Sequence, residues 1–202
     1  MTEEQIKHLN ELVAKTTKRA QSYAIMLSHV ANIQNPLIVE TGCARKEDNF
    51  DGDGMSTIIF DTLVDYHGGD FYSVDINPDN VRFAEKNTKK ARVFCGDSVA
   101  YLHNQNKTWV QQGRKIDLLY LDSFDFDINE PHPSSLHHIL EMVAISPSLG
   151  PGTMICVDDN FLMERSDTGE RFEIGKGGYV KQYMDAIHKD RIFNGYQWIW
   201  KL

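Results

Sequence analysis

Residues 37–42 read LIVETG, an apolar run that closes on an acidic residue, Glu40, and a glycine, Gly42. Residues 71–75 read FYSVD and repeat the design, with Asp75 at the end of the run. Such runs are typical of buried parallel strands, and an acid at the carboxyl end of one faces the crevice where open α/β sheets bind ligands. Asp75 is therefore placed to accept hydrogen bonds from two ribose hydroxyls, and Gly42 lets backbone approach the ligand closely. The two strands predict a nucleoside-binding crevice.

Strands and helices alternate along the rest of the chain. Further strands are expected at 92–95, 116–121 and 153–158, and helices at about 55–67, 79–90, 97–104, 134–146 and 178–188. Strands joined by helices of this length imply right-handed crossovers and parallel pairing. Residues 191–202 should add one or two final strands, with Trp198 and Trp200 in the core. The pattern predicts an α/β, Rossmann-like, doubly wound fold whose mostly parallel seven-stranded sheet has an antiparallel C-terminal edge.

Apolar residues recur at helical spacing between residues 3 and 33, and no proline precedes Pro36. We expect residues 1–35 to form an N-terminal helical extension that acts as a lid or as a dimer contact, which makes a homodimer one candidate assembly. Residues 36–202 are expected to form the ligand-binding domain, because no repeat, low-complexity tract or linker divides them.

The net charge and the cysteine content limit the classes of partner and the cellular location that we expect. A net charge of −8 over 202 residues disfavours a general electrostatic grip on nucleic acid phosphates or on an anionic membrane. We therefore expect a small-molecule substrate, and neither nucleic acid nor membrane as a partner. The cysteines Cys43, Cys95 and Cys156 are far apart and odd in number, which indicates reduced thiols. The opening segment lacks an apolar signal core and no run is long enough for a membrane span, so the expected location is the cytoplasm.

Three segments are loops by composition: 44–54, 122–133 and 160–177. Each follows the carboxyl end of an expected strand, so all three converge on one rim of the sheet, where function on this fold resides. The first loop is long and charged, and we interpret it as a solvated, mobile lid. Gly175 to Gly178 are expected to form a flexible hinge that lets residues 160–177 close over substrate.

Four motifs carry a resemblance to a known family. They are Glu40-Thr41-Gly42, Val74-Asp75-Ile76-Asn77-Pro78, Cys95-Gly96-Asp97-Ser98 and Ile116-Asp117-Leu118-Leu119-Tyr120-Leu121-Asp122. In order and spacing, they resemble the successive motifs of class I S-adenosylmethionine-dependent methyltransferases over about residues 36 to 160. The resemblance implies that S-adenosylmethionine is the cofactor and that residues 36–202 are the methyltransferase domain.

The resemblance also implies a role for each motif. The backbone around Gly42 would approach the methionine moiety, Glu40 would hold its amino group directly or through water, and Ser56 would face its carboxylate from a helix N-terminus. Asp97 and Ser98 would bind the adenine, while Asp97 also suits a helix N-cap, and both roles can coexist. The implied cofactor-binding residues are Glu40, Gly42, Ser56, Asp75, Asp97, Ser98 and Asp122.

Acidic and amide side chains end two neighbouring strands. Asp122 ends the fourth strand, and Asp158, Asp159 and Asn160 end the fifth. Oxygen ligands gathered beside the transferred methyl suit Mg²⁺ or another divalent cation. The arrangement resembles that of catechol O-methyltransferases and of metal-dependent macrolide and aminocoumarin sugar O-methyltransferases, and the match favours Asp159 and Asn160 as ligands. The alternative is that Asp122 binds only cofactor and that the other three cap the following loop.

The general base is less defined. The catechol enzymes place a lysine three residues after the strand-four aspartate, whereas this chain has Asp125 there. The candidates for the catalytic residues are Asp122, Asp125 and His132, with Lys176 as a further candidate for the base. Metal activation of the acceptor alone is another option. His137 and His138 are interpreted as surface or packing residues.

The sequence predicts a metal-dependent O-methyltransferase acting on a hydroxyl of a small molecule, such as a sugar or catechol-like diol, with Phe124, Phe126 and Phe161 as candidate walls. Two alternatives are a metal-independent small-molecule methyltransferase and a non-catalytic S-adenosylmethionine-binding module. A nicotinamide-dependent oxidoreductase is disfavoured because no G-x-G-x-x-G turn follows the first strand. A nucleic-acid base methyltransferase is disfavoured because an Asn/Asp-Pro-Pro-aromatic turn is missing after strand four.

Overall fold

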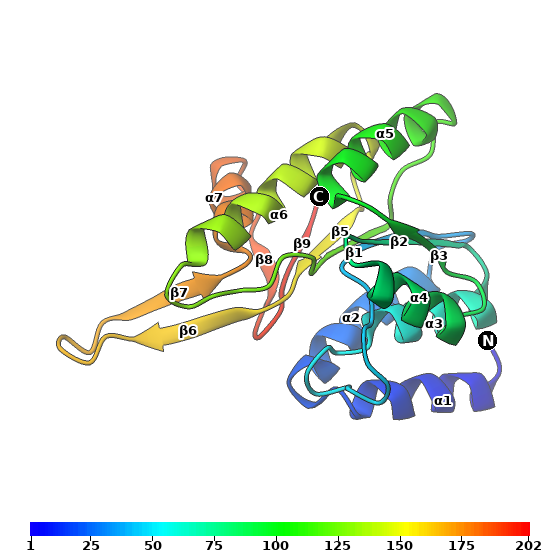
Figure 1. Ribbon diagram of the computed structural model, residues 1–202, viewed down its shortest axis with the longest axis horizontal. Coiled ribbons are helices and arrows are strands. Elements are labelled where there is room, and N and C mark those ends of the chain that lie inside the picture. The colour runs from blue at the N-terminus through cyan, green and yellow to red at the C-terminus, as the bar shows by residue number, and fades with distance from the viewer.

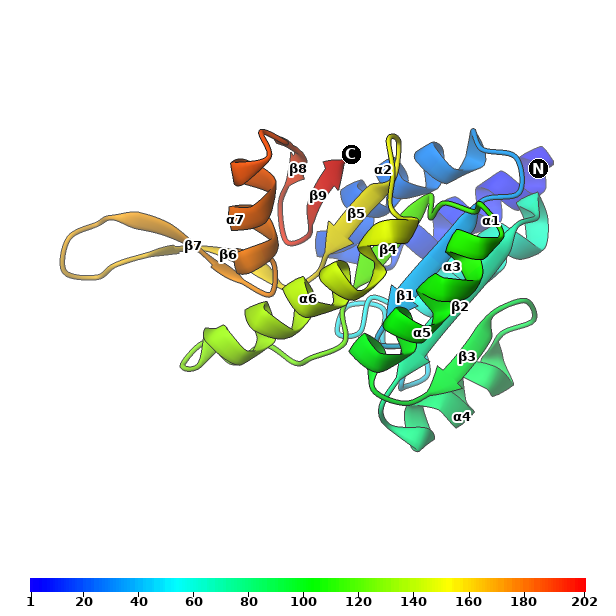
Figure 2. The ribbon, with the colours of Figure 1, turned by 90° about the horizontal axis from the view of Figure 1, so that it is seen from above.

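The core of the protein is a seven-stranded sheet, seen in a computed structural model that describes residues 1–202. Its order is β3-β2-β1-β4-β5-β9-β8, as Figure 2 shows from above. The strands are β1 (Leu37–Thr41), β2 (Asp70–Asp75), β3 (Arg92–Cys95), β4 (Leu118–Leu121), β5 (Met154–Val157), β8 (Arg191–Asn194) and β9 (Trp198–Lys201). β9 pairs antiparallel with both neighbours, and the other pairings are parallel. The predicted fold class is confirmed, with the antiparallel strand one position in from the edge.

Helices cover both faces of the sheet, as Figure 1 shows. One face carries α1 (Glu3–Ala14), α2 (Ala20–Ala31), α3 (Ser56–His67) and α4 (Pro78–Asn87). The other carries α5 (Ser98–Gln111), α6 (Pro131–Ile145) and α7 (Gly178–Ala186). Short 3₁₀ helices occupy Thr17–Arg19 and Ser146–Ser148. The crossovers leave the carboxyl ends of β1, β2 and β4 at one rim.

The period-two alternation of the strands divides the core into two layers. In β1, Ile38 packs in the cluster under α2 and α3, while Leu37 and Val39 pack in the cluster under α5, α6 and α7. Trp198 and Trp200 join the second cluster, which confirms their assignment to the core. Each fully buried side chain of this size contributes roughly 1.5–3 kcal/mol.

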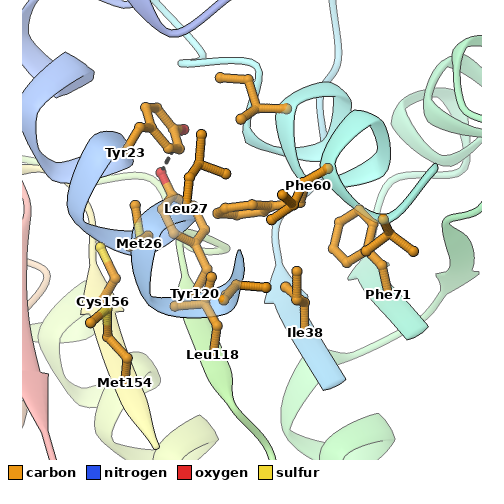
Figure 3. Packing of buried hydrophobic residues seen from close by; sticks show 14 of the residues in the cluster. Tyr23, Met26, Leu27, Ile38, Phe60, Phe71, Leu118, Tyr120, Met154 and Cys156 are labelled. Atoms are coloured by element: carbon orange, nitrogen blue, oxygen red, sulfur yellow. Dashed lines mark hydrogen bonds between the residues drawn. The ribbon is translucent and has the colours of Figure 1, made fainter. Parts of the chain in front are cut away.

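The N-terminal helices share the first layer. Tyr23 and Met26 of α2 belong to the same buried cluster as Tyr120 and Phe60, and the Tyr23 ring stacks on that of Tyr120 with centroids 6.2 Å apart (Figure 3). Leu9 of α1 belongs to the same cluster. Residues 1–35 are thus packed against the sheet; their role as lid or dimer contact stays a prediction.

The segment 160–177, expected to be a loop, is a β-hairpin. β6 (Asn160–Glu164) pairs antiparallel with β7 (Arg171–Gly175), and both views show the pair projecting from the body of the molecule (Figures 1 and 2). Exposure alternates along β6 after the buried Asn160: Phe161 and Met163 are half-buried, whereas Leu162 and Glu164 are exposed, as in a strand with one covered face. The polar residues between the strands form only the turn.

Several helix boundaries also differ from the expected ones, among them the end of α4, at Asn87 instead of 90. α5 runs to Gln111 instead of 104, since Trp109 is buried in the core and anchors the last turn. α6 begins at Pro131 instead of 134, because proline suits the first turn of a helix, where the missing N–H has no partner to lose. No helix in the structure has both the length and the apolar character that a membrane span requires.

Candidate functional site

Two adjoining cavities lie at the carboxyl ends of β1, β2 and β4. The first has a volume of about 230 Å³ and a predominantly polar lining that includes Gly42, Arg45 and Ser56. The second, of about 430 Å³, is bounded by Val74, Ile76, Asp97, Ser98, Phe124 and His137. The cavities share Asp75, Ile76, Ser123 and Asp125. Together they form space for one elongated ligand with a polar end and a more apolar end.

Asp75 lies where the two cavities meet. Its carboxylate accepts hydrogen bonds from the backbone N–H of Cys43 at 3.1 Å, from that of Asn77 at 2.8 Å and from the side-chain amide of Asn80 at 3.2 Å. These three donors fix the carboxylate at the end of β2. Asp75 thus lines both cavities at the end of β2, and its role as a ribose-binding acid stays a prediction.

Gly42 has a left-handed backbone with a φ of +80°. A Cβ at this position would lie 2.5 Å from the carbonyl oxygen of Asp122. The glycine is therefore required because the chain after β1 passes close to the chain after β4. The sequence interpretation assigned the close approach to the ligand; Gly42 does line the first cavity, but the tight contact is with protein backbone.

Glu40 is fully buried beneath the first cavity and does not line it. Its Oε2 accepts hydrogen bonds from Thr57 Oγ1 at 2.8 Å and Ser73 Oγ at 2.6 Å, while its Oε1 has no partner. Burial raises the pKa of this carboxyl to about 7, against the hydrogen bonds that lower it. Ser56, the first residue of α3, does line the cavity and brings a helix N-terminus to it.

Asp97 and Ser98 border the second cavity. The Asp97 carboxylate accepts a hydrogen bond from the N–H of Ala100 at 2.8 Å, which confirms the N-cap of α5. Ser98 donates to Glu141, a fully buried residue of α6 that also accepts from Ser123 at 2.6 Å and Thr41 at 3.0 Å. Asp97 thus caps the helix and borders the cavity at once.

Glu141 was not singled out from the sequence. The signal was its position four residues after His137, on the helix face that also carries the buried Met142 and Ile145. His137 Nε2 lies 3.2 Å from Glu141 Oε1, and this hydrogen bond raises the pKa of the imidazole. His137 therefore borders the cavity as part of a buried network and is not a free surface residue.

Three carboxylates converge where β4 and β5 end. One oxygen each of Asp122, Asp158 and Asp159 lies within 4.8 Å of the others. Two buried cations are interleaved with them. Arg19 forms a bidentate pair with Asp158, with its Nε at 3.0 Å and its Nη2 at 2.8 Å from Oδ2. Lys176 Nζ lies 2.5 Å from Asp122 Oδ1 and 2.9 Å from Asp159 Oδ2.

The pKa values in this cluster follow from burial and charge. Burial raises the pKa of Asp122, and the neighbouring Asp158 and Asp159 raise it further, although Lys176 opposes them. Burial alone would lower the pKa of Lys176, but the carboxylates of Asp122 and Asp159 raise it, so the ammonium stays charged. Lys176 holds the pKa of Asp159 below its ordinary value against the effect of burial.

The predicted metal ligands are committed to other partners. Both oxygens of Asp158 accept from Arg19. The amide oxygen of Asn160 accepts from the N–H of Gly177 at 2.8 Å, and its amide nitrogen donates to the carbonyl of Val157 at 2.8 Å. Lys176 occupies the space between Asp122 and Asp159. In this arrangement the four residues do not fit a resident divalent cation.

The remaining catalytic candidates are separated. Asp125 lines both cavities and pairs with Arg45 at 3.3 Å across the opening. His132 lines neither; its Nδ1 lies 2.6 Å from the Tyr179 hydroxyl, beside a different hollow at the start of α6. The structure therefore brings Asp122 and Asp125 to one cavity and leaves His132 outside it.

Aromatic side chains divide between the two ends of the site. Phe124 borders the second cavity, with its ring centroid 5.5 Å from that of His137. Phe126 and Phe161 stack at 5.5 Å, and Tyr196 packs edge-on against Phe161 at 5.4 Å. Tyr196 also donates a hydrogen bond to Asp159. Phe126 and Phe161 therefore lie on the carboxylate side, and Phe124 lies with the second cavity.

No protein-family model matches this sequence, and no curated protein sequence matches it. Solved structures do resemble it. The MycE methyltransferase from the mycinamycin biosynthetic pathway, solved in complex with Mg and SAH, is similar with a TM-score of 0.58 and 15% identity over 96% of this chain and 52% of its own. A protein from Plasmodium falciparum assigned as a ribosomal RNA methyltransferase has a TM-score of 0.53 and 12% identity, over 94% of each chain.

NSun6 from Pyrococcus horikoshii also resembles this chain, with a TM-score of 0.53 and 12% identity over 87% of it. The chain spans about half the length of MycE and of NSun6, at 52% and 50%. At these identities the similarity shows a Rossmann-like methyltransferase fold.

Proposed function

We propose that this protein is an S-adenosylmethionine-dependent methyltransferase that acts on a hydroxyl group of a small molecule. The observation that carries the proposal is the charge of the first cavity, where Asp53, Asp75, Asp122 and Asp125 face a single cationic residue, Arg45. Such a lining favours a ligand with positive charge and disfavours a pyrophosphate. A sulfonium with an amino acid ammonium is a ligand of that kind.

The residues fit this cofactor along the whole elongated space. Asp75 would hold the ribose, and the second cavity, with Ile76 and Phe124 as apolar walls and Asp97 as a hydrogen-bond acceptor, would hold the adenine. The amino acid end would lie in the first cavity beside Ser56. The orphaned Oε1 of Glu40 beneath it is an unused acceptor that a bound water or ammonium would satisfy.

Bound S-adenosylmethionine supplies an electrophilic methyl group to the acceptor oxygen and leaves as the neutral thioether S-adenosylhomocysteine. The protein must then position the hydroxyl and remove its proton. Asp122 is the candidate acceptor of that proton, because it lines the cavity at the end of β4 and its side chain remains 15% exposed. Lys176 donates to the Asp122 carboxylate, and Thr41 at the end of β1 accepts from the Asp122 N–H, so both residues hold Asp122 in place.

The aromatic group of Phe126, Phe161 and Tyr196 lies on the acceptor side of Asp159 and supports a substrate with a flat or apolar face. We propose the metal-independent form of the enzyme, since the predicted ligands are engaged by Arg19 and Lys176. A homodimer remains one candidate assembly, and we propose neither nucleic acid nor membrane as a partner, given the net charge of −8.

Isothermal titration calorimetry with S-adenosylhomocysteine tests the cofactor assignment. The wild-type protein should bind it, and Asp75→Asn should weaken binding at least about tenfold, because the amide replaces one ribose acceptor with a donor. Asp79→Asn, an exposed change in the neighbouring α4, is the matched control and should leave affinity unchanged.

NAD⁺ is the competing ligand in the same titration and should not bind, since its pyrophosphate would face the aspartates. Binding of NAD⁺ without S-adenosylhomocysteine would remove the proposal in favour of an oxidoreductase. Cofactor binding without methyl transfer to any hydroxyl in a panel of phenols, catechols and sugars would favour the non-catalytic binding module.

A further inference from the structure

We infer that the ammonium of Lys176 takes the place of a divalent ion in the carboxylate cluster of Asp122, Asp158 and Asp159, where β4 and β5 end. Removal of this ammonium should convert the cluster into a metal site. The inference concerns the cluster itself and does not depend on which cofactor the cavities bind. It gives Lys176 the part of a positioning residue that acts through Asp122.

The hydrogen bonds of Lys176 are complete. Its side chain is 1% exposed, and its Nζ lies 2.5 Å from Asp122 Oδ1, 2.9 Å from Asp159 Oδ2 and 3.3 Å from the carbonyl oxygen of Asp122. An ammonium has three N–H donors, and here three oxygens surround it. These oxygens come from two adjoining strands, as the ligands of a bridging cation would.

The backbone holds the lysine in this position. Gly175 has a φ of +149°, and a Cβ there would lie 2.4 Å from the carbonyl oxygen of Asp159. The N–H of Lys176 donates to that carbonyl at 3.2 Å, and the N–H of Gly177 donates to Asn160 Oδ1 at 2.8 Å. The turn predicted to be a flexible hinge is therefore fastened to the end of β5 on both sides of the lysine.

Two protein cations offset most of the carboxylate charge without a metal. Arg19 neutralises Asp158, and Lys176 is shared by Asp122 and Asp159, so the cluster retains one net negative charge. A divalent ion would have to displace an ammonium that is tethered by its own chain, and a tethered competitor acts at high effective concentration. Without the ammonium, Asp122 would lose its cation, and Asp159 would keep only Arg19, at 3.6 Å, and the Tyr196 hydroxyl. The carboxylate oxygens then facing each other are ligands of the kind that hard cations such as Mg²⁺ and Mn²⁺ take.

One consequence rests on the proposed function. A chelating metal selects acceptors with two adjacent oxygens, whereas a single ammonium held behind Asp122 imposes no such requirement. Acceptors with one isolated hydroxyl should therefore be methylated as efficiently as the corresponding vicinal diols.

The test is a Mn²⁺ titration in which the electron paramagnetic resonance signal of the free ion reports binding. Lys176→Met is the principal variant. Any Mn²⁺ binding to the wild-type protein should be unchanged by Asp122→Asn. Lys176→Met should gain one Mn²⁺ site with an affinity at least about tenfold above that of wild type, and the double variant Lys176→Met/Asp122→Asn should lose it. Lys181→Met, which removes an ammonium 2.7 Å from Asp185 in an exposed pair on α7, is the matched control and should gain nothing.

Two outcomes overturn the inference: a wild-type Mn²⁺ site that Asp122→Asn abolishes, or a folded Lys176→Met protein that binds Mn²⁺ no better than wild type. Lys176→Gln is the second variant in case Lys176→Met does not fold, because it removes the positive charge and keeps a polar side chain; it should gain the same site. The Mn²⁺ measurement needs no cofactor, so it can be interpreted even if the protein does not bind S-adenosylhomocysteine. A negative Mn²⁺ result likewise leaves the cofactor titration interpretable.

Discussion

Glu40→Gln tests the energetics of the buried carboxyl beneath the first cavity. The folded protein holds the pKa of Glu40 at about 7, against an ordinary value of 4.5, because the carboxyl is buried and only one of its oxygens accepts hydrogen bonds. Its charge is thus more costly in the folded state than in the unfolded chain. Glutamine keeps the shape and an acceptor for Thr57 and Ser73, and it never ionises.

The sign follows from proton linkage. Between pH 4.5 and about 7 the folded protein holds a proton at Glu40 that the unfolded chain has released. The free energy of unfolding of the wild type must therefore fall, relative to Glu40→Gln, as pH rises through this window. The difference between 4.5 and about 7 corresponds to about 3 kcal/mol at about 1.4 kcal/mol per pH unit. Most of that change should be complete by pH 8.

Urea denaturation of both proteins at pH 5, 6, 7 and 8 measures the effect. Other titrating groups are common to the two proteins and cancel in the difference. Glu85→Gln, a change at an exposed residue of α4, is the control and should show a constant difference from wild type. A Glu40→Gln difference that stays flat from pH 5 to pH 8, or that shrinks, would refute a destabilising buried charge at Glu40.

Two further predictions concern buried ion pairs. Arg19→Met should lower the free energy of unfolding by about 3–5 kcal/mol in urea denaturation, because it leaves Asp158 buried without its cation, whereas Lys7→Met in an exposed pair should change it by less than about 1 kcal/mol. An Arg19→Met loss as small as that of Lys7→Met would contradict the buried pair. His137 has a raised pKa in the folded state, so its interaction with Glu141 stabilises the protein fully below about pH 6.5 and is lost as pH rises through the folded-state value. His137→Gln should thus destabilise more at pH 6 than at pH 9 in thermal unfolding, and equal losses at both pH values would count against the pair.

Local chemistry explains which expectations the structure confirms. The N-cap at Asp97 depends on a hydrogen bond to Ala100, three residues away, and the sequence shows both partners. The alternation that places Trp198 and Trp200 in the core is likewise contained in one strand. The hairpin at 160–177 was missed because the polar and charged residues between its strands resemble a loop, and because each strand has only five residues and pairs only with the other.

The sequence by itself determined the alternation of helices with the strands of the seven-stranded sheet and the acids at the strand ends, because burial of alternate residues and the side-chain type at each position are local properties. Only the tertiary structure decided what those acids contact. Arg19 reaches Asp158 across 139 residues, and Lys176 reaches Asp122 across 54. Partners so distant in the chain are chosen by how the 3₁₀ helix Thr17–Arg19 and the β6–β7 hairpin pack on the sheet, and this choice determines whether the carboxylates meet a protein cation or a metal.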